Sequence, residues 1–194
     1  MSNYQNETIP VREAHRLDEE KLRVYLSANM DGIGDDIAMC QFAVGQSNPT
    51  YMISTGGCEF VLRKKPPGTL LPSAHAVDRE YRIMTALRDT DVPVPKTYLL
   101  CEDESVLGTA FFVMDKVDGR VLDDQCAPAF SPEERGAVYD HLLQVLAAFH
   151  AVDYEAVGLG DFGRPGNYYE RQINRWTKQY LASQTDDIEA MMKL

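Results

Sequence analysis

Short runs rich in apolar, β-branched and aromatic residues follow one another along the first half of the chain, bounded by turn residues, which is the pattern of strands. Five segments show it: residues 37–42, 50–54, 58–65, 97–101 and 108–116. Thr55-Gly56-Gly57 reads as a tight hairpin turn between the second and third segments, so the first three strands form an antiparallel meander. The fifth segment is strongly apolar, and we expect it near the centre of the sheet.

Other segments carry apolar residues at the three- and four-residue spacing of amphipathic helices. They predict helices at about residues 18–30, 73–87, 131–150 and 168–181, while residues 188–194 resemble the middle of a helix rather than its end. Asp18, Ser73 and Ser131 stand at N-cap positions, and Glu134 completes a capping box with Ser131. The apolar stripe of the third helix comprises Val138, Leu142, Val145, Leu146 and Phe149.

The change from strand to helix patterns divides the chain into three parts. Residues 1–36 form an N-terminal arm and helix, of which residues 1–14 are expected to be loose. Residues 37–119 form a β-rich lobe, and residues 120–194 form a helical remainder. The predicted fold class is therefore α+β.

Composition limits the function classes. The chain has 30 acidic and 19 basic side chains and a net charge of −11, which argues against non-specific binding to nucleic acid or to anionic membranes. No apolar run approaches the roughly 20 residues of a membrane-spanning helix, and residues 1–10 lack the apolar core of a signal peptide. The four cysteines form no CxxC pair, which favours reduced thiols over zinc or disulfides. We expect a cytoplasmic protein.

The strand at residues 58–65 ends in three cations, Arg63, Lys64 and Lys65. Strand alternation places Arg63 on the same face as Val61, with Lys64 on the opposite face. Glu80 falls inside the apolar stripe of the second predicted helix, where an unpaired carboxylate is costly. Its nearest suitable partner is Arg63. An ordinary strand with solvated cations, and a Glu80 that leans out at the edge of the stripe, would fit the same pattern.

A short turn of small and polar residues joins the first two strands, and it comprises Gly45, Gln46, Ser47 and Asn48. Its backbone N–H groups can approach an anion, and Ser47 and Asn48 offer further donors. The same residues would also serve as a plain hairpin turn. Lys64 and Lys65, at the strand end, are expected to be solvated or to lie at the edge of a substrate site.

The order of this turn, Arg63, Glu80 and two further strands resembles the N-terminal lobe of the protein-kinase-like fold, in the aminoglycoside phosphotransferase and choline kinase superfamily. The stretches 61–68, 77–81 and 158–168 are similar to the branch that includes the phosphotransferase domain of acyl-CoA dehydrogenase family members ten and eleven. The resemblance covers about residues 38–182. It implies a five-stranded antiparallel N-lobe with one helix, followed by an incomplete helical C-lobe.

The resemblance also implies a nucleotide site. Arg63 would contact the α- and β-phosphates of ATP, and Glu80 would orient it. Val61 would pack on the adenine, with Met114 behind it. The turn Gly45, Gln46, Ser47 and Asn48 would cover the phosphates, while the C=O of Asp115 and the N–H of Val117 would bind the purine edge. A guanidinium in place of the usual lysine can bridge carboxylate and phosphate at once.

The catalytic half of such a site has no counterpart in these 194 residues. Family members carry a loop of the form HGDxxxxN and a later Asp, which position the substrate hydroxyl and hold Mg²⁺. No His-Gly-Asp occurs in the sequence, and neither His150 nor Asp161 stands in a suitable context. We therefore assign no catalytic residue and no metal ligand.

The resemblance implies an ATP- and Mg²⁺-dependent small-molecule kinase that transfers the γ-phosphoryl group to a substrate hydroxyl, with a hydroxyacyl-CoA or hydroxy acid as acceptor. On this interpretation the chain is a truncated form that is inactive alone. Two alternatives stay open: a non-catalytic nucleotide-binding or interaction module, and an α+β domain with a structural ion pair. An incomplete C-lobe would expose apolar surface, so self-association is expected.

Overall fold

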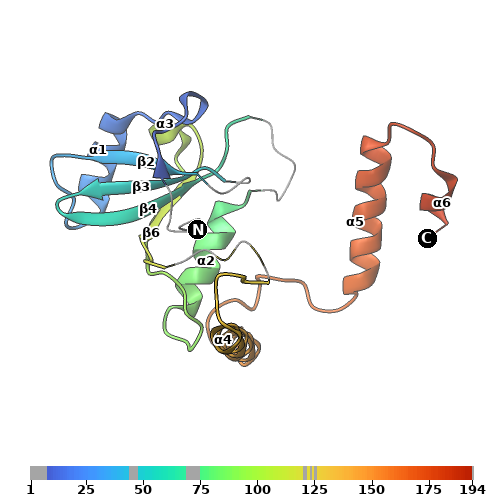
Figure 1. The fold of residues 1–194 in the computed structure, drawn as a ribbon. Helices are drawn as coiled ribbons and strands as arrows, with labels where there is room; N and C mark the ends of the chain where they lie inside the picture. The colour runs from blue at the N-terminus through green and yellow to red at the C-terminus, as the bar shows by residue number, and fades with distance from the viewer. Residues whose placement is uncertain are drawn as a thin grey trace. The chain divides into compact units, whose positions relative to one another are not determined.

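The computed structural model describes residues 8–43, 48–68, 75–119, 122, 124 and 126–193. The predicted turn residues Gly45, Gln46 and Ser47, and the predicted cap Ser73, lie outside this part of the chain. The chain divides into two compact units, residues 1–153 and residues 154–194. The first unit contains the sheet (Figure 1).

One antiparallel sheet runs through the first unit in the order β1-β2-β3-β4-β6-β5. Its strands are β1 (Thr8–Ile9), β2 (Ala38–Phe42), β3 (Thr50–Thr55), β4 (Cys58–Lys64), β5 (Thr97–Cys101) and β6 (Phe111–Asp115). The five predicted strands are confirmed, and the apolar β6 lies between β4 and β5 as expected. The predicted number is wrong by one, because Thr8 and Ile9 pair with Phe42 and Gln41. A strand of two residues is too short to show alternation.

The hairpin between β3 and β4 has the predicted turn. Gly56 and Gly57 have φ values of 55° and 77°, which is the left-handed conformation that a two-residue hairpin turn requires at both positions. A Cβ atom on Gly56 would lie 2.8 Å from the carbonyl oxygen of Gly32, whereas a Cβ on Gly57 would meet nothing within 4 Å. Glycine at position 56 therefore also allows the close approach of another loop.

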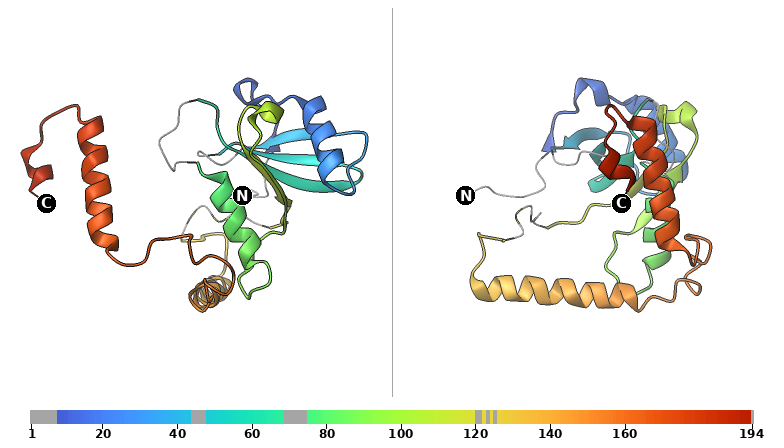
Figure 2. Two further views of the ribbon diagram at one scale, coloured as in Figure 1. Left: turned by 180° about the vertical axis from the view of Figure 1, so that it is seen from behind. Right: turned by 90° about the vertical axis from the view of Figure 1, so that its right-hand side faces the viewer.

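The sheet packs its main core against α1 (Glu19–Asn29). Asp18 caps this helix as predicted, because its side chain accepts a hydrogen bond from the N–H of Lys21 at 3.0 Å. Leu22 and Leu26 are buried against side chains of the sheet that include Ile53 and Leu62. Seen from behind, α1 lies across the strands (Figure 2).

The other face of the sheet receives α2 (Val77–Leu87), whose Tyr81 ring meets the Phe112 ring of β6 edge-on at 6.0 Å. The helix begins at Val77, later than predicted, and both Val77 and Leu87 are buried. Between β5 and β6 lies a short helix, α3 (Glu104–Leu107), which Asp103 caps. A 3-10 turn, η1 (Glu13–His15), precedes α1.

The helix α4 (Pro132–His150) begins with the predicted capping box. Glu134 N–H donates to the Ser131 hydroxyl at 3.2 Å, and Ser131 N–H donates to the Glu134 carboxylate at 2.8 Å. Within the described chain no residue of α4 is buried. Leu142, Leu146 and Phe149 of its predicted stripe are exposed, while Val138 and Val145 are half-buried. The pattern thus predicted the helix correctly, while part of its apolar stripe faces solvent. Self-association stays a prediction.

The second unit contains α5 (Tyr168–Ser183), as predicted, and α6 (Glu189–Met192). Ile173 and the single tryptophan, Trp176, are exposed on α5. Across the described residues of both units, no helix is both long enough and apolar enough to cross a membrane.

Candidate nucleotide-binding site

Arg63 and Glu80 form the pair that the pattern predicts. Arg63 lies near the end of β4 on the face toward α2, and its Nε donates to Glu80 Oε2 at 2.5 Å. The two side chains are 30% and 36% exposed, so the pair is accessible from solvent. A charged hydrogen bond of this length fixes the orientation of the guanidinium.

Two residues of the β2–β3 region close this pair into a ring of hydrogen bonds. Asn48 Nδ2 donates to the second oxygen of Glu80, Oε1, at 2.9 Å. Arg63 Nη1 donates to the hydroxyl of Thr50 at 3.2 Å, and that hydroxyl donates to the carbonyl oxygen of Asn48 at 3.1 Å. Both carboxylate oxygens of Glu80 are therefore engaged, and Asn48 is 3% exposed.

His75 extends the ring beyond Asn48. Its Nδ1 lies 2.9 Å from Asn48 Oδ1. Because Asn48 directs its Nδ2 group at Glu80, its Oδ1 is an acceptor, so His75 Nδ1 carries the proton in this arrangement. His75 also has a φ of 57°, which is uncommon for a residue other than glycine. Sequence reasoning missed His75, since a lone histidine before a helix belongs to no recognisable motif.

One donor group of Arg63 remains available. Nε and Nη1 are engaged, and among the described residues Nη2 has no hydrogen-bond partner. A half-exposed guanidinium with a fixed orientation and a free edge is suited to bind an anion, and phosphate matches its fork geometry. Asn48, in contrast, uses its side chain within the protein, so only its main chain is left for a ligand.

An apolar surface lies on the same face as Arg63. Val61 pairs directly with Met114 across the β4–β6 ladder, and Val61 is buried while Met114 is half-buried. The side chain of Asp115, at the end of β6, accepts a hydrogen bond from the Tyr98 hydroxyl at 2.5 Å. This hydrogen bond, together with burial, raises the pKa of Tyr98 to about 12. The predicted purine contacts of Asp115 and Val117 use only their main chains, and they stay predictions.

Lys64, on the opposite face, differs from the prediction of a solvated or substrate-edge cation. It is 6% exposed, and its Nζ donates to the Thr109 hydroxyl at 2.5 Å. Burial lowers the pKa of Lys64, because the charged form loses hydration. Alternation predicted the correct face, but it could not show that Thr109, 45 positions further on, covers the strand end.

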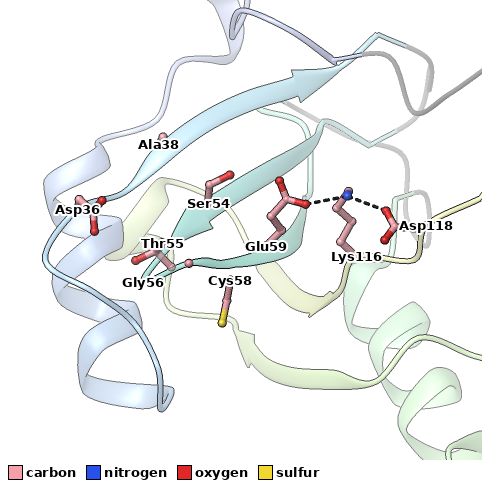
Figure 3. A pocket seen from close by; sticks show the side chains of 10 residues that line it. Asp36, Ala38, Ser54, Thr55, Gly56, Cys58, Glu59, Lys116 and Asp118 are labelled. Carbon is pink, nitrogen blue, oxygen red and sulfur yellow. Dashed lines mark hydrogen bonds and ion pairs between the residues drawn. The ribbon is translucent and has the colours of Figure 1, made fainter.

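A hollow of about 560 Å³ opens at the hairpin end of β3 and β4 (Figure 3). Lys116 forms 2.7 Å ion pairs with Glu59 and Asp118, and these hydrogen bonds hold its pKa above the usual range. Lys116 and Asp118 flank Val117 in the sequence, so the hollow borders the segment predicted to bind the purine edge. Sequence reasoning missed this hollow, because its lining comes from three separate segments, residues 36–38, 54–59 and 116–118.

The residues described here do not fit a metal site. Within residues 8–43, 48–68, 75–119 and 126–193, no group of three or more His, Cys, Asp or Glu side chains is placed to hold a metal ion. We therefore derive no chemistry from a metal bound by these residues.

Comparison with known proteins places the chain in a family. The profile of the phosphotransferase enzyme family matches residues 38–194, so the chain belongs to this family. A solved structure assigned as an aminoglycoside phosphotransferase, from Ralstonia eutropha, is 52% identical with a TM-score of 0.75 over 91% of this chain and 51% of that chain. The predicted protein-kinase-like α+β fold is confirmed.

The predicted branch of the superfamily is confirmed as well. Acyl-CoA dehydrogenase family member 11 of Rattus norvegicus is 42% identical over 192 residues, which cover 97% of this chain and 25% of that protein. Acyl-CoA dehydrogenase family member 10 of Mus musculus is 45% identical over 188 residues, which cover 96% and 18%. The chain thus spans a quarter or less of these two relatives and about half of the solved structure.

Proposed function

We propose that this chain forms the nucleotide-binding part of an ATP-dependent phosphotransferase that acts on a small-molecule hydroxyl. The observation that carries the proposal is Arg63, whose Nε and Nη1 are held by Glu80 and Thr50 while Nη2 has no partner among the described residues. Membership of the phosphotransferase enzyme family supports the assignment to a kinase-like enzyme.

The proposed nucleotide lies on the α2 face of the sheet. Arg63 binds the α- and β-phosphates, and Glu80 keeps its guanidinium in the phosphate-binding orientation. Val61 and Met114 provide the apolar surface for the adenine, whose polar edge meets the main chain of Asp115 and Val117. Gly45, Gln46 and Ser47 cover the phosphates in this proposal, with the main chain of Asn48 at the end of their turn.

The chemistry of transfer is a separate part of the proposal. Mg²⁺ accompanies ATP in such enzymes and neutralises charge on its phosphates. The described residues of this chain supply no set of ligands for it. Because the 194 residues contain no His-Gly-Asp, we expect them to bind ATP without transferring its γ-phosphoryl group. The proposed acceptor is a hydroxyacyl-CoA or a hydroxy acid.

Isothermal titration calorimetry with ATP tests the proposal. The wild-type chain should bind ATP with a measurable Kd, and Arg63→Met should weaken binding about 10- to 100-fold, because a charged hydrogen bond contributes about 1.5–3 kcal/mol. Lys21→Met is the matched control: it removes the same charge from α1, on the other face of the sheet, and should leave the Kd unchanged.

Two results would contradict the proposal. Wild-type chain that binds no ATP at millimolar concentration would exclude both the kinase and the non-catalytic nucleotide-binding module, and it would leave a structural role for the ion pair. Equal losses of ATP affinity in Arg63→Met and Lys21→Met would show that the affinity depends on the net charge of the protein and not on a contact with Arg63.

A further inference from the structure

We propose that Asn48 and His75 are positioning residues of the nucleotide site, which hold Glu80, and through it Arg63, in the phosphate-binding orientation. The inference rests on the proposed function. It assigns a role to two side chains that do not themselves touch the nucleotide, and the relay runs from His75 through Asn48 and Glu80 to Arg63.

Asn48 is built for this role rather than for direct contact with a ligand. Its side chain is almost fully buried, and both ends of its amide are used: Nδ2 donates to Glu80 and Oδ1 accepts from His75. Its carbonyl oxygen also accepts the hydroxyl of Thr50, which in turn accepts from Arg63. A buried amide with a partner at each end has a single favoured orientation.

The geometry explains why Arg63 depends on Asn48. A glutamate carboxylate that accepts at one oxygen only can rotate about its last side-chain torsion, χ3, because this torsion has a broad range of low-energy angles. Asn48 occupies Oε1 of Glu80, so Oε2 is directed at Arg63 Nε. Without this donor, Glu80 loses a hydrogen bond and gains freedom, and Arg63 must then give up conformational entropy when it binds phosphate.

His75 fixes the direction of the Asn48 amide. If the amide turned over, its NH₂ group would meet the protonated Nδ1 of His75, and its oxygen would face the carboxylate of Glu80. Both contacts would be repulsive. The backbone of His75 keeps a left-handed φ of 57°, and this conformation brings the ring to Asn48 from the residue two positions before α2.

Variants of these two residues test the relay by separating phosphate binding from base binding. Kd values for ATP and for adenosine are measured by NMR titration of the full chain. Asn48→Ala should weaken ATP binding about 5- to 10-fold, which is the size of one ordinary hydrogen bond because the loss reaches Arg63 only through Glu80, and it should leave adenosine binding unchanged. Asn29→Ala is the matched control, because among the described residues the Asn29 side chain bonds its own helix, at Tyr25 O.

Substitutions at His75 provide a rescue. Asn places its Nδ2 where His places Nδ1, and it also tolerates a left-handed φ, so His75→Asn should bind ATP within about twofold of wild type. His75→Ala has no donor and should weaken ATP binding about threefold. The left-handed backbone conformation at this position is kept by a non-glycine residue in both the Ala variant and the wild type, so the difference between their Kd values reports the side chain.

Three outcomes would overturn the inference. Asn48→Ala with unchanged ATP binding would show that Glu80 needs no such support. Equal weakening of ATP and adenosine binding would show a purely structural role. A failure of His75→Asn to exceed His75→Ala would remove His75 from the relay. Wild-type chain that binds no ATP would instead overturn the proposed function, and the relay with it.

Discussion

The ion pair between Arg63 and Glu80 should contribute to stability as well as to binding, and a double-mutant cycle measures that contribution. The variants are Arg63→Met, Glu80→Gln and the double variant. Each substitution keeps the approximate side-chain volume and removes one charge, so the coupling energy reports the interaction between the two groups.

The structure sets the expected size of this coupling. The Nε–Oε2 distance is 2.5 Å, and the hydrogen bond is between two charged groups, which suggests about 1.5–3 kcal/mol. Each side chain is about one third exposed, and solvent screening lowers the value toward that of surface pairs. We therefore expect a coupling of about 1–2 kcal/mol in the free energy of unfolding.

Urea denaturation followed by far-UV circular dichroism provides the measurement. Tryptophan fluorescence is unsuitable, because the single tryptophan, Trp176, lies in the second unit, whereas the pair lies in the first. Arg23 and Glu20 on α1 form the control cycle: their distance is 2.6 Å, but Glu20 is 71% exposed and the pair is local. It should show a smaller coupling than Arg63 and Glu80.

The reasoning is refuted if the Arg63–Glu80 coupling is within about 0.3 kcal/mol of zero, which is the limit of ordinary additivity. It is also refuted if the control cycle gives an equal or larger value. Either result would mean that the ring around Glu80 does not hold the pair together in solution.

Further substitutions test the rest of the first unit. Lys64→Met should raise the free energy of unfolding by about 1 kcal/mol in urea melts at pH 7, because it removes a buried charge that donates to a neutral hydroxyl, that of Thr109. Burial lowers the pKa of Lys64 in the folded state, whereas the unfolded chain loses this proton only near pH 10.5. The free energy of unfolding of the wild type should therefore rise relative to that of Lys64→Met as the pH increases from the folded-state pKa toward about 10.5. A difference between the two proteins that stays constant with pH would contradict this. Gly56→Ala and Gly57→Ala both place a Cβ at positive φ, but only the Cβ at position 56 meets a backbone oxygen. Thermal melts should therefore show that Gly56→Ala lowers the free energy of unfolding by at least about 1 kcal/mol more than Gly57→Ala does. Equal losses of stability would refute the close approach of the Gly32 loop. Ser131→Ala should destabilise α4 by about 1 kcal/mol, seen as faster amide exchange in its first turn, while unchanged exchange would argue against the capping box.

The pairing of Arg63 with Glu80 was predictable because the two-residue period of the strand and the 3.6-residue period of the helix both indicate it. Strand alternation determines the face of Arg63, and the helical stripe determines the side of Glu80. A costly carboxylate on the packing side of a helix then needs a cation nearby. Similar reasoning predicted the glycine turn and the caps of α1 and α4, since each depends on residues that are close in sequence.

Contacts between distant residues were beyond such reasoning. The bond from Asn48 to Glu80 joins residues 32 positions apart, and that from His75 to Asn48 joins residues 27 apart. Neither follows from a local period, because each depends on how the β2–β3 region approaches α2. The burial of Lys64 was missed for the same reason, and β1 was missed because two residues carry no period.

The claim that the nucleotide binds on the α2 face, over Val61 and Met114 and beside Arg63, is tested most directly by methyl NMR during titration with ATP. A bound adenine ring should shift the Val61 and Met114 methyl resonances in a saturable way, while those of Leu22 and Leu26, buried on the α1 side, stay in place. Saturable shifts confined to the α1 side, or no shifts at saturating ATP, would contradict the claim.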